Sequence, residues 1–126
     1  MKRTEWLEGP STPYFRCINE SDGITSNMLD CNGIEHARLV QRLNELYQHS
    51  LTGLSPTRQE RLRKSHEKWT KAYPRECNRE PEQKLLEGGT LASVFYSACI
   101  LTETDARILW LEHRYGSTAS QPDQAR

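Results

Sequence analysis

Apolar residues recur at steps of three and four along most of the chain, which is the spacing of a helix with one buried face. The longest such pattern runs from the N-cap candidates Thr25 and Ser26 to the stop signal Thr52-Gly53. A second runs from Ser55, a predicted N-cap followed by a proline, to about Tyr73. The short connection between them predicts an antiparallel helical hairpin. The predicted inward residues are Met28, Cys31, Leu39, Leu43, Leu46, Tyr47 and Leu51 in the first helix, and Leu62, Trp69, Ala72 and Tyr73 in the second.

Two further helices are predicted after a loop over residues 74–90, which contains Pro74, Pro81 and Gly88-Gly89. The third carries Leu91, Val94, Phe95, Ala98 and Leu101 on one face. The fourth begins at the N-cap candidate Thr104 and ends at Gly116, with Ile108, Leu111 and Tyr115 facing inward. No stretch alternates with the period of a strand. We therefore predict an all-α fold, a small bundle of about four helices around the hairpin.

The ends of the chain lack this pattern. Residues 1–24 contain Gly9-Pro10, Pro13 and Gly23 and are predicted to form an irregular arm, while the small polar residues of 117–126 predict a disordered tail. The helical domain is placed at residues 17–116. The chain has 126 residues, of which 35% are hydrophobic and 27% charged, so we expect one domain with a small core. No run of about 18 apolar residues predicts a transmembrane helix.

The net charge is zero, with 17 basic and 17 acidic residues, which argues against a dedicated nucleic-acid-binding protein. Charge is nevertheless uneven, because residues 58–79 hold eight basic and three acidic residues, a net charge of +5. Such a helix could meet an anionic partner, or it could be a solvated face balanced by the rest of the chain. We favour the solvated face.

Four cysteines, Cys17, Cys31, Cys77 and Cys99, predict two disulfides, since the number is even, the chain is short and no CxxC pair is present. Disulfides imply an oxidising compartment, either the periplasm or the outside of the cell. The favoured pairs are Cys17–Cys31 and Cys77–Cys99, each closing a short loop. The alternative pairing, Cys31–Cys77 with Cys17–Cys99, would instead tie the two ends of the hairpin together. The sequence does not exclude this alternative. The first residues lack the apolar segment of a signal peptide, so we expect this chain to be the mature part of an exported protein.

Catalytic patterns are missing from the sequence. The four histidines, His36, His49, His66 and His113, lack zinc-site spacing, and no GxSxG segment is present. We therefore expect no metal, no cofactor and no catalytic residue. Tyr47 and Trp69 are interpreted as core, His66 as hydrogen-bonded or partly buried beside Trp69, and Trp6 as an exposed contact residue.

An ordered set of residues resembles the LprI-like family (lysozyme inhibitor LprI, N-terminal). It consists of Cys17, Thr25, Met28, Cys31, Leu43-Asn44, Tyr47, Leu62-Arg63, Trp69, Cys77, Gly88-Gly89-Thr90, Cys99, Thr104, Arg107 and Leu111, covering about residues 17 to 111. The chain departs from the family pattern at Val40, where the family commonly has Asp, at His66, where it usually has Gln, and at Ala72-Tyr73-Pro74.

The resemblance implies a small periplasmic or secreted domain that acts by binding. It suggests inhibition of a peptidoglycan-degrading enzyme, either a lysozyme or a rival bacterium's cell-wall toxin, in which case the protein confers immunity. The alternatives are a non-catalytic envelope structural or assembly protein and, less favoured, a cell-wall enzyme. Typical lysozymes are cationic and would be repelled by the basic helix, which directs contact to the acidic arm or the C-terminal helices.

Binding residues favour loops on a rigid scaffold, so the predicted contact segments are Met1–Arg16 and Pro74–Gly89. The candidate contact residues within or beside them are Trp6, Arg75, Arg79, Glu82 and Glu87. The family residues Leu43, Asn44, Tyr47, Leu62, Arg63, Trp69, Gly88, Gly89, Thr104 and Arg107 are expected to be structural.

Overall fold

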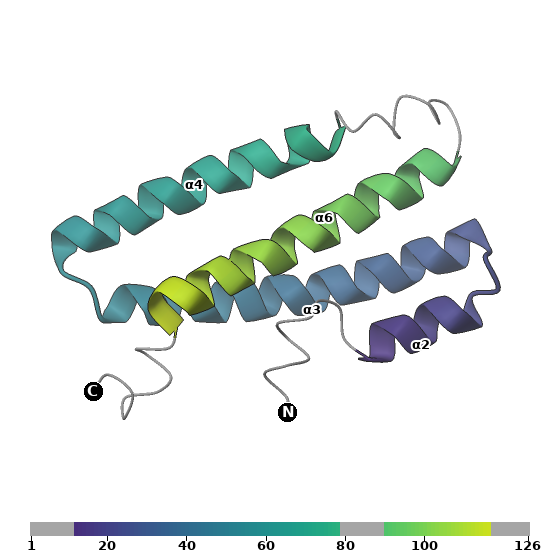
Figure 1. Cartoon of the computed structure of the whole chain (residues 1–126), viewed down its shortest axis with the longest axis horizontal. Helices are drawn as coiled ribbons and strands as arrows, with labels where there is room; N and C mark the ends of the chain where they lie inside the picture. Colours follow the sequence, from purple (N-terminus) through teal and green to yellow (C-terminus); the bar gives the residue numbers. More distant parts are fainter. Residues whose placement is uncertain (1–11, 79–89, 117–126) are drawn as a thin grey trace.

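The computed structural model describes residues 12–78 and 90–116, and almost all of them are helical (Figure 1). The elements are α2 (Thr12–Glu20), α3 (Thr25–Thr52), α4 (Pro56–Asn78), α6 (Thr90–Leu111) and a π-helical turn, η1 (Glu112–Gly116). These ranges contain no strand. The predicted small all-α bundle of about four helices is therefore confirmed. The expected packing of α3 against α4 is not, because α6 is the main partner of α3 and lies between the two helices of the hairpin.

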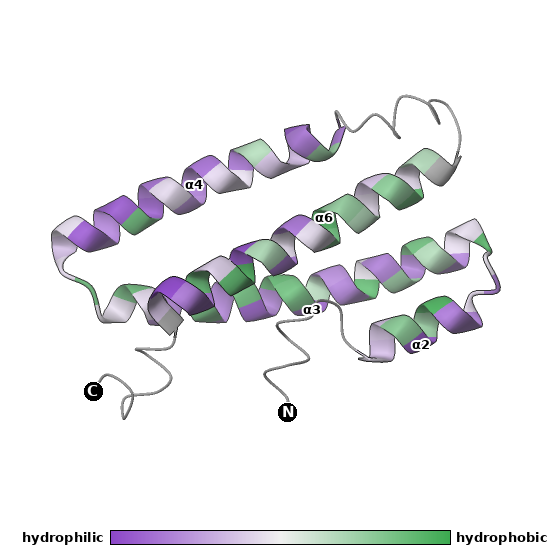
Figure 2. Ribbon diagram, viewed as in Figure 1, coloured by the Kyte–Doolittle hydropathy of each residue, from purple (hydrophilic) through white to green (hydrophobic). Residues whose placement is uncertain are grey.

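The core lies chiefly between α3 and α6, which pack against each other more extensively than any other pair of elements. α6 lies between α3 and α4 in Figure 1. The core side chains are Leu39, Leu43, Leu46, Leu51, Leu62, Leu101, Ile108 and Leu111. Only one of these leucines, Leu62, comes from α4, and Figure 2 shows how hydrophilic most of α4 is beside the largely hydrophobic α6. The predicted thin apolar face of α4 is confirmed.

Both favoured disulfides are present. Cys17 is bonded to Cys31 with their Cα atoms 5.8 Å apart, and Cys77 is bonded to Cys99 with Cα atoms 5.6 Å apart. Both distances lie in the usual range for disulfides. The alternative pairing of Cys31 with Cys77 is excluded. One bond ties α2 to α3, and the other ties the end of α4 to α6.

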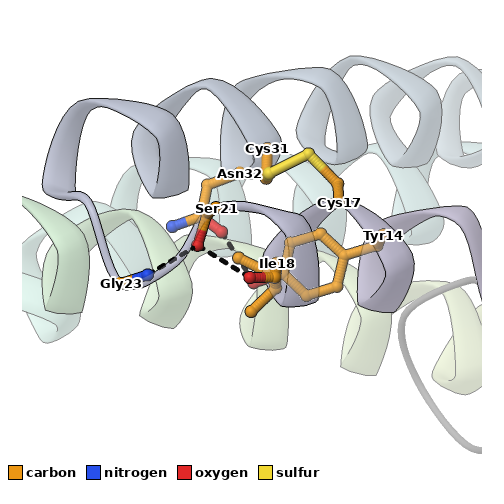
Figure 3. The surroundings of a disulfide bond; sticks show 7 residues. All are labelled: Tyr14, Cys17, Ile18, Ser21, Gly23, Cys31 and Asn32. Atoms are coloured by element: carbon orange, nitrogen blue, oxygen red, sulfur yellow. Dashed lines mark hydrogen bonds between the residues drawn. A yellow bond between two sulfur atoms is a disulfide. The ribbon is translucent and has the colours of Figure 1, made fainter.

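The arm is not irregular over its whole length, because residues 12–20 form α2. Helical structure persists there because Cys17 is bonded to α3 and the Tyr14 hydroxyl donates to Asn32 Oδ1 at 2.6 Å, contacts that sequence periodicity cannot reveal (Figure 3). The chain then reverses at Asp22 and Gly23, whose φ angles of 55° and 72° are left-handed. Asp and Gly are residues that tolerate this conformation. Residues 1–11 lie outside the described part.

The predicted end of the second helix at Tyr73 is wrong. α4 continues through Pro74 to Asn78. A proline removes one backbone donor from a helix and clashes with the preceding turn, which normally favours a break. Here the next turn holds the buried Cys77, whose bond to Cys99 stabilises the continuation. Tertiary structure thus overrides the local proline signal.

The predicted break at Thr104 is also wrong, since α6 is continuous from Thr90 to Leu111. Thr104 is 1% exposed and its hydroxyl donates to the Ile100 carbonyl at 2.8 Å, so it is satisfied inside the helix instead of capping a new one. Beyond α6, Arg42 of α3 pairs with Glu112 of η1 at 2.8 Å and fixes the end of the bundle.

Of the predicted N-caps, Ser55 is confirmed and Thr25 is wrong. Ser55 caps α4, as its hydroxyl accepts the Arg58 backbone N–H at 3.3 Å. Thr25 is already helical, and the preceding Ile24 occupies the cap position without a side-chain bond.

Phe95 was predicted to face inward but is 44% exposed, because the N-terminal half of α6 extends past the core formed by the second half of α3.

Candidate partner-binding site

α4 is the most lightly buried long helix in the described part of the chain. Its only buried residues are Leu62 and Cys77. Its basic side chains are mostly exposed, with two weak ion pairs along the helix, Arg63 with Glu60 and Lys71 with Glu67, each at 3.6 Å. Such exposed pairs contribute little to stability. α4 therefore depends on specific contacts to hold it against α3 and α6.

One of these contacts is an aromatic stack that crosses from α3 to α4. The Tyr47 ring stacks on His66 with centroids 4.1 Å apart, His66 lies 5.5 Å from Trp69, and Trp69 lies 4.4 Å from Tyr73. The spacing His66, Trp69, Tyr73 places all three rings on one face of α4. All four rings are half-buried, so the stack joins the core to the surface.

Arg107 of α6 inserts beside this stack. It is 7% exposed, and its guanidinium carbon lies 4.1 Å from the Trp110 ring centroid and 5.5 Å from that of Trp69. Its Nε donates to His66 Nδ1 at 3.3 Å and its Nη2 donates to Ser65 Oγ at 3.2 Å. No carboxylate in the described residues pairs with it. Aromatic faces and two neutral acceptors therefore offset the cost of burying this charge.

The electrostatics of this Arg107 cluster, formed by Tyr47, Ser65, His66, Trp69, Arg107 and Trp110, keep His66 neutral. Burial and the neighbouring Arg107 charge lower the pKa of His66 from 6.5 to about 4. Burial likewise lowers the pKa of Arg107 and raises the pKa of Tyr47. A neutral His66 can accept the Arg107 hydrogen bond, which an imidazolium could not.

The family residues quoted above divide into three groups in space. Leu43, Leu62 and Thr104 are buried, Tyr47, Trp69 and Arg107 meet in the Arg107 cluster, and Asn44 and Arg63 are exposed. Gly88 and Gly89 lie outside the described residues. Sequence reasoning did not identify Ser65 and Trp110 as members of the cluster. The three-residue spacing of Arg107 and Trp110 was the available signal.

An open cavity of about 310 Å³ lies where α4 approaches the first half of α3 and the N-terminal half of α6. We call it the open-end cavity, and it is lined by Leu29, Asn32, Gly33, His36, Tyr73, Pro74, Tyr96, Ser97 and Ile100. It adjoins the end of α4 that the Cys77–Cys99 bond clamps. Burial and the nearby Tyr96 raise the pKa of Tyr73. Its lining was not predicted, because it comes from three helices far apart in sequence.

A second cavity, of about 410 Å³, lies at the other end of the bundle, beside the turn from α3 to α4. It is lined by His49, Ser50, Thr52, Gly53, Leu54, Arg58, Arg114 and Tyr115. Two of these side chains are guanidinium groups and none is acidic. The two cavities thus differ in charge, because the second is lined by two guanidinium groups and the open-end cavity by none.

The predicted contact residues can be placed only in part. Arg75 is exposed on α4 next to Pro74 of the open-end cavity, and its Nε donates to the Lys71 carbonyl at 3.3 Å. Trp6, Arg79, Glu82 and Glu87 lie outside the described residues, as do most of the two predicted contact segments. Tyr47 and Trp69 pack against the core, in agreement with their interpretation.

Within residues 12–78 and 90–116, no three His, Cys, Asp or Glu side chains are grouped so that they could hold a metal ion. In the same ranges, every helix is too short or too polar to cross a membrane.

Comparison with known proteins gives one match. The family model of the lysozyme inhibitor LprI matches residues 17–111, from the first cysteine to the last core leucine of α6. No curated protein and no solved structure matches the chain. The matched region spans about three quarters of the sequence and includes both disulfides and the Arg107 cluster. The chain therefore belongs to the lysozyme inhibitor LprI family.

Proposed function

We propose that this protein is a periplasmic or secreted binding protein that inhibits a peptidoglycan-degrading enzyme, either a lysozyme or a cell-wall-targeting effector. Membership of an inhibitor family over residues 17–111 is the observation that carries the proposal. The two disulfides support the location, because such bonds persist in oxidising compartments.

The chemistry of the Arg107 cluster supports a binding role over a catalytic one. A histidine with a shifted pKa is a common sign of an active site. Here, however, His66 Nδ1 accepts from Arg107, and the imidazole ring is stacked between Tyr47 and Trp69. The His66 side chain, whose pKa is lowered, therefore holds α4 against α3 and α6.

The end of the bundle beside the Cys77–Cys99 bond is the surface that we favour for the enzyme. It combines the open-end cavity with the exposed Arg75. The Cys77–Cys99 disulfide holds α4 to α6 at this end of the bundle. Arg75, together with Trp6, Arg79, Glu82 and Glu87, remains our proposed set of contact residues. Because α4 is basic, we expect the enzyme to meet this end with an acidic surface.

The test measures the clearing of a peptidoglycan suspension by a panel of lysozymes, amidases and lytic transglycosylases, with and without the protein. We expect stoichiometric inhibition of at least one enzyme and loss of inhibition after reduction and alkylation of the disulfides. The proposal fails if every enzyme keeps its full rate and light scattering detects no complex.

A charge-reversal pair locates the surface. Arg75→Glu should weaken inhibition by about tenfold, since a like charge opposes the acidic partner. Arg61→Glu, at another exposed position on the same helix that does not line the cavity, should change inhibition by less than about twofold. Equal effects of both substitutions would place the contact elsewhere.

A further inference from the structure

We propose that the second cavity, beside the turn from α3 to α4, binds a small organic oxyanion, a carboxylate or phosphate group carried on a compact carbon body. We call this space the turn cavity. The inference goes beyond the proposed function and does not depend on it, because the turn cavity lies at the opposite end of the bundle from the surface favoured for the enzyme.

Two arginine side chains from different elements line the turn cavity. Arg58 comes from the first turn of α4, and Arg114 comes from η1 at the end of α6. Within residues 12–78 and 90–116, neither of them forms an ion pair with a carboxylate. Two positive charges that line one hollow repel each other, and an anion bound between them removes this repulsion.

The charge of the lining itself, and not the charge of a whole helix, indicates an anion. Among the described residues that line the cavity, the permanently charged ones are Arg58 and Arg114, and none is acidic. The acidic residues nearest in sequence to the lining all have other partners: Glu45 with Gln41, Glu60 with Arg63, and Glu112 with Arg42. A hollow lined by one sign of charge concentrates the field and attracts the opposite sign.

The surroundings hold the two arginines in place before any ligand binds. The Arg114 guanidinium carbon lies 5.4 Å from the ring centroid of Trp110, which also packs edge-on against Tyr115 with centroids 5.9 Å apart. The backbone N–H of Arg58 donates to Ser55 Oγ at 3.3 Å, which fixes the start of α4. This existing order lowers the entropic cost of binding a ligand between them.

The end of α3 does not oppose an anion with free carbonyl groups. A helix C-terminus usually presents such carbonyls, which repel a negative guest. Here the Leu51 carbonyl accepts from the Leu54 N–H at 3.1 Å and from Gln59 Nε2 at 2.8 Å. The His49 carbonyl accepts from the Thr52 hydroxyl at 2.7 Å. These carbonyls are therefore occupied, and the positive end of the α4 dipole begins in the same turn.

The walls favour an organic anion over a bare ion. Leu54 and Tyr115 pack against the core and add apolar surface to the lining. The volume of about 410 Å³ lies at the lower end for pockets that take small molecules. Guanidinium groups match the oxygen geometry of carboxylates and phosphates. An oxyanion attached to a body the size of one ring therefore suits both the charge and the apolar wall.

The first experiment titrates benzoate, phenyl phosphate and neutral benzamide into the full-length protein at constant ionic strength and follows amide NMR signals. We expect at least one of the two anions to shift the signals of Gly53, Leu54 and Tyr115 and to bind at least tenfold more tightly than benzamide. The tighter anion assigns the site to carboxylate or phosphate. Equal binding of benzamide, or shifts confined to other regions, would overturn the proposal.

The second experiment removes the guanidinium groups one at a time. Arg58→Gln and Arg114→Gln should each weaken binding of the tighter anion by about tenfold, because each loses a charged hydrogen-bond donor. Arg61→Gln, at an exposed position of α4 outside the lining, should weaken it by less than about twofold. The same loss in all three variants would show a diffuse attraction to α4 and would overturn the site.

A third pair of variants leaves both arginines intact. Thr52→Glu places a carboxylate in the lining and should abolish anion binding, whereas Thr52→Gln, of the same size without the charge, should weaken binding by less than about threefold. The tighter anion should also raise the thermal unfolding midpoint of the wild type and of Thr52→Gln but not that of Thr52→Glu. Equal binding by the two variants would show that charge does not govern the cavity.

Discussion

Arg107 shows at the scale of one residue how a charge can be buried without an ion pair. Two tryptophan faces, His66 and Ser65 surround its guanidinium, and each contact depends on the planar shape and the fixed directions of its N–H groups. Lysine has neither property, although it carries the same charge. This position therefore requires the shape of the guanidinium group as well as its positive charge.

We accordingly predict that Arg107→Lys destabilises the protein by about 1–3 kcal/mol, because it loses the two hydrogen bonds and the stacking. The measurement is urea unfolding with the disulfides intact. The exposed Arg61→Lys serves as the matched control and should change stability by less than about 0.5 kcal/mol. A similarly small change for Arg107→Lys would show that charge alone matters.

His66 predicts a dependence of stability on pH. Its pKa is about 4 when folded and near 6.5 when unfolded, so only the unfolded state takes up a proton between these values. The free energy of unfolding should therefore fall as pH is lowered from 6.5 toward 4. Burial raises the pKa of Asp105, which works in the opposite direction, so a single-site comparison is needed.

Thermal unfolding of His66→Gln provides that comparison. Glutamine keeps an acceptor for Arg107 but does not titrate, so the difference in midpoint between variant and wild type should change steadily from pH 7 to pH 4.5. The control Gln48→Ala, at an exposed position that does not titrate, should give a constant difference. Parallel curves for His66→Gln and wild type would contradict the assignment.

At the scale of elements, α4 is the helix whose position depends most on tethers. The three-residue turn 53–55 fixes its start, the Arg107 cluster its middle and the Cys77–Cys99 bond its end. α3 and α6, by contrast, are held together by a continuous apolar contact. α2 is held by the other disulfide and by the Tyr14–Asn32 hydrogen bond.

Removing the two disulfides separately should therefore loosen different helices. We expect Cys77→Ser/Cys99→Ser to cost about 3 kcal/mol and to speed hydrogen exchange along α4, mostly near its C-terminal end. Cys17→Ser/Cys31→Ser should speed exchange in α2 and leave α4 protected. Exchange measured by mass spectrometry distinguishes these patterns, and uniform loosening in both variants would show that the bundle responds as one unit.

At the scale of the whole molecule, a neutral protein carries a strongly basic helix on one side. The net charge of the chain does not reveal this uneven distribution. The affinity of an interface on that side would depend on the local charge. We predict that inhibition of the target weakens as sodium chloride is raised from about 50 to 300 mM, since salt screens attraction between exposed charges. Inhibition that strengthens with salt would instead indicate a cationic target meeting α4.

The sequence by itself determined much of this organisation. Helical periodicity identified α3, α4 and most of α6, and the number and spacing of cysteines favoured the disulfide pairs that are present. Leu43, Leu62 and Ile108 were expected in the core because their positions repeat with the period of the helix. These features depend on local spacing, which a chain displays before it folds.

Tertiary structure decided the remainder. Pro74 and Thr104 look like helix boundaries, yet a disulfide beyond Pro74 and a buried environment around Thr104 keep both helices continuous. The first residues of α2 become helical because they are attached to α3. The Arg107 cluster and the open-end cavity combine side chains from three helices, and only packing brings such distant residues within contact distance.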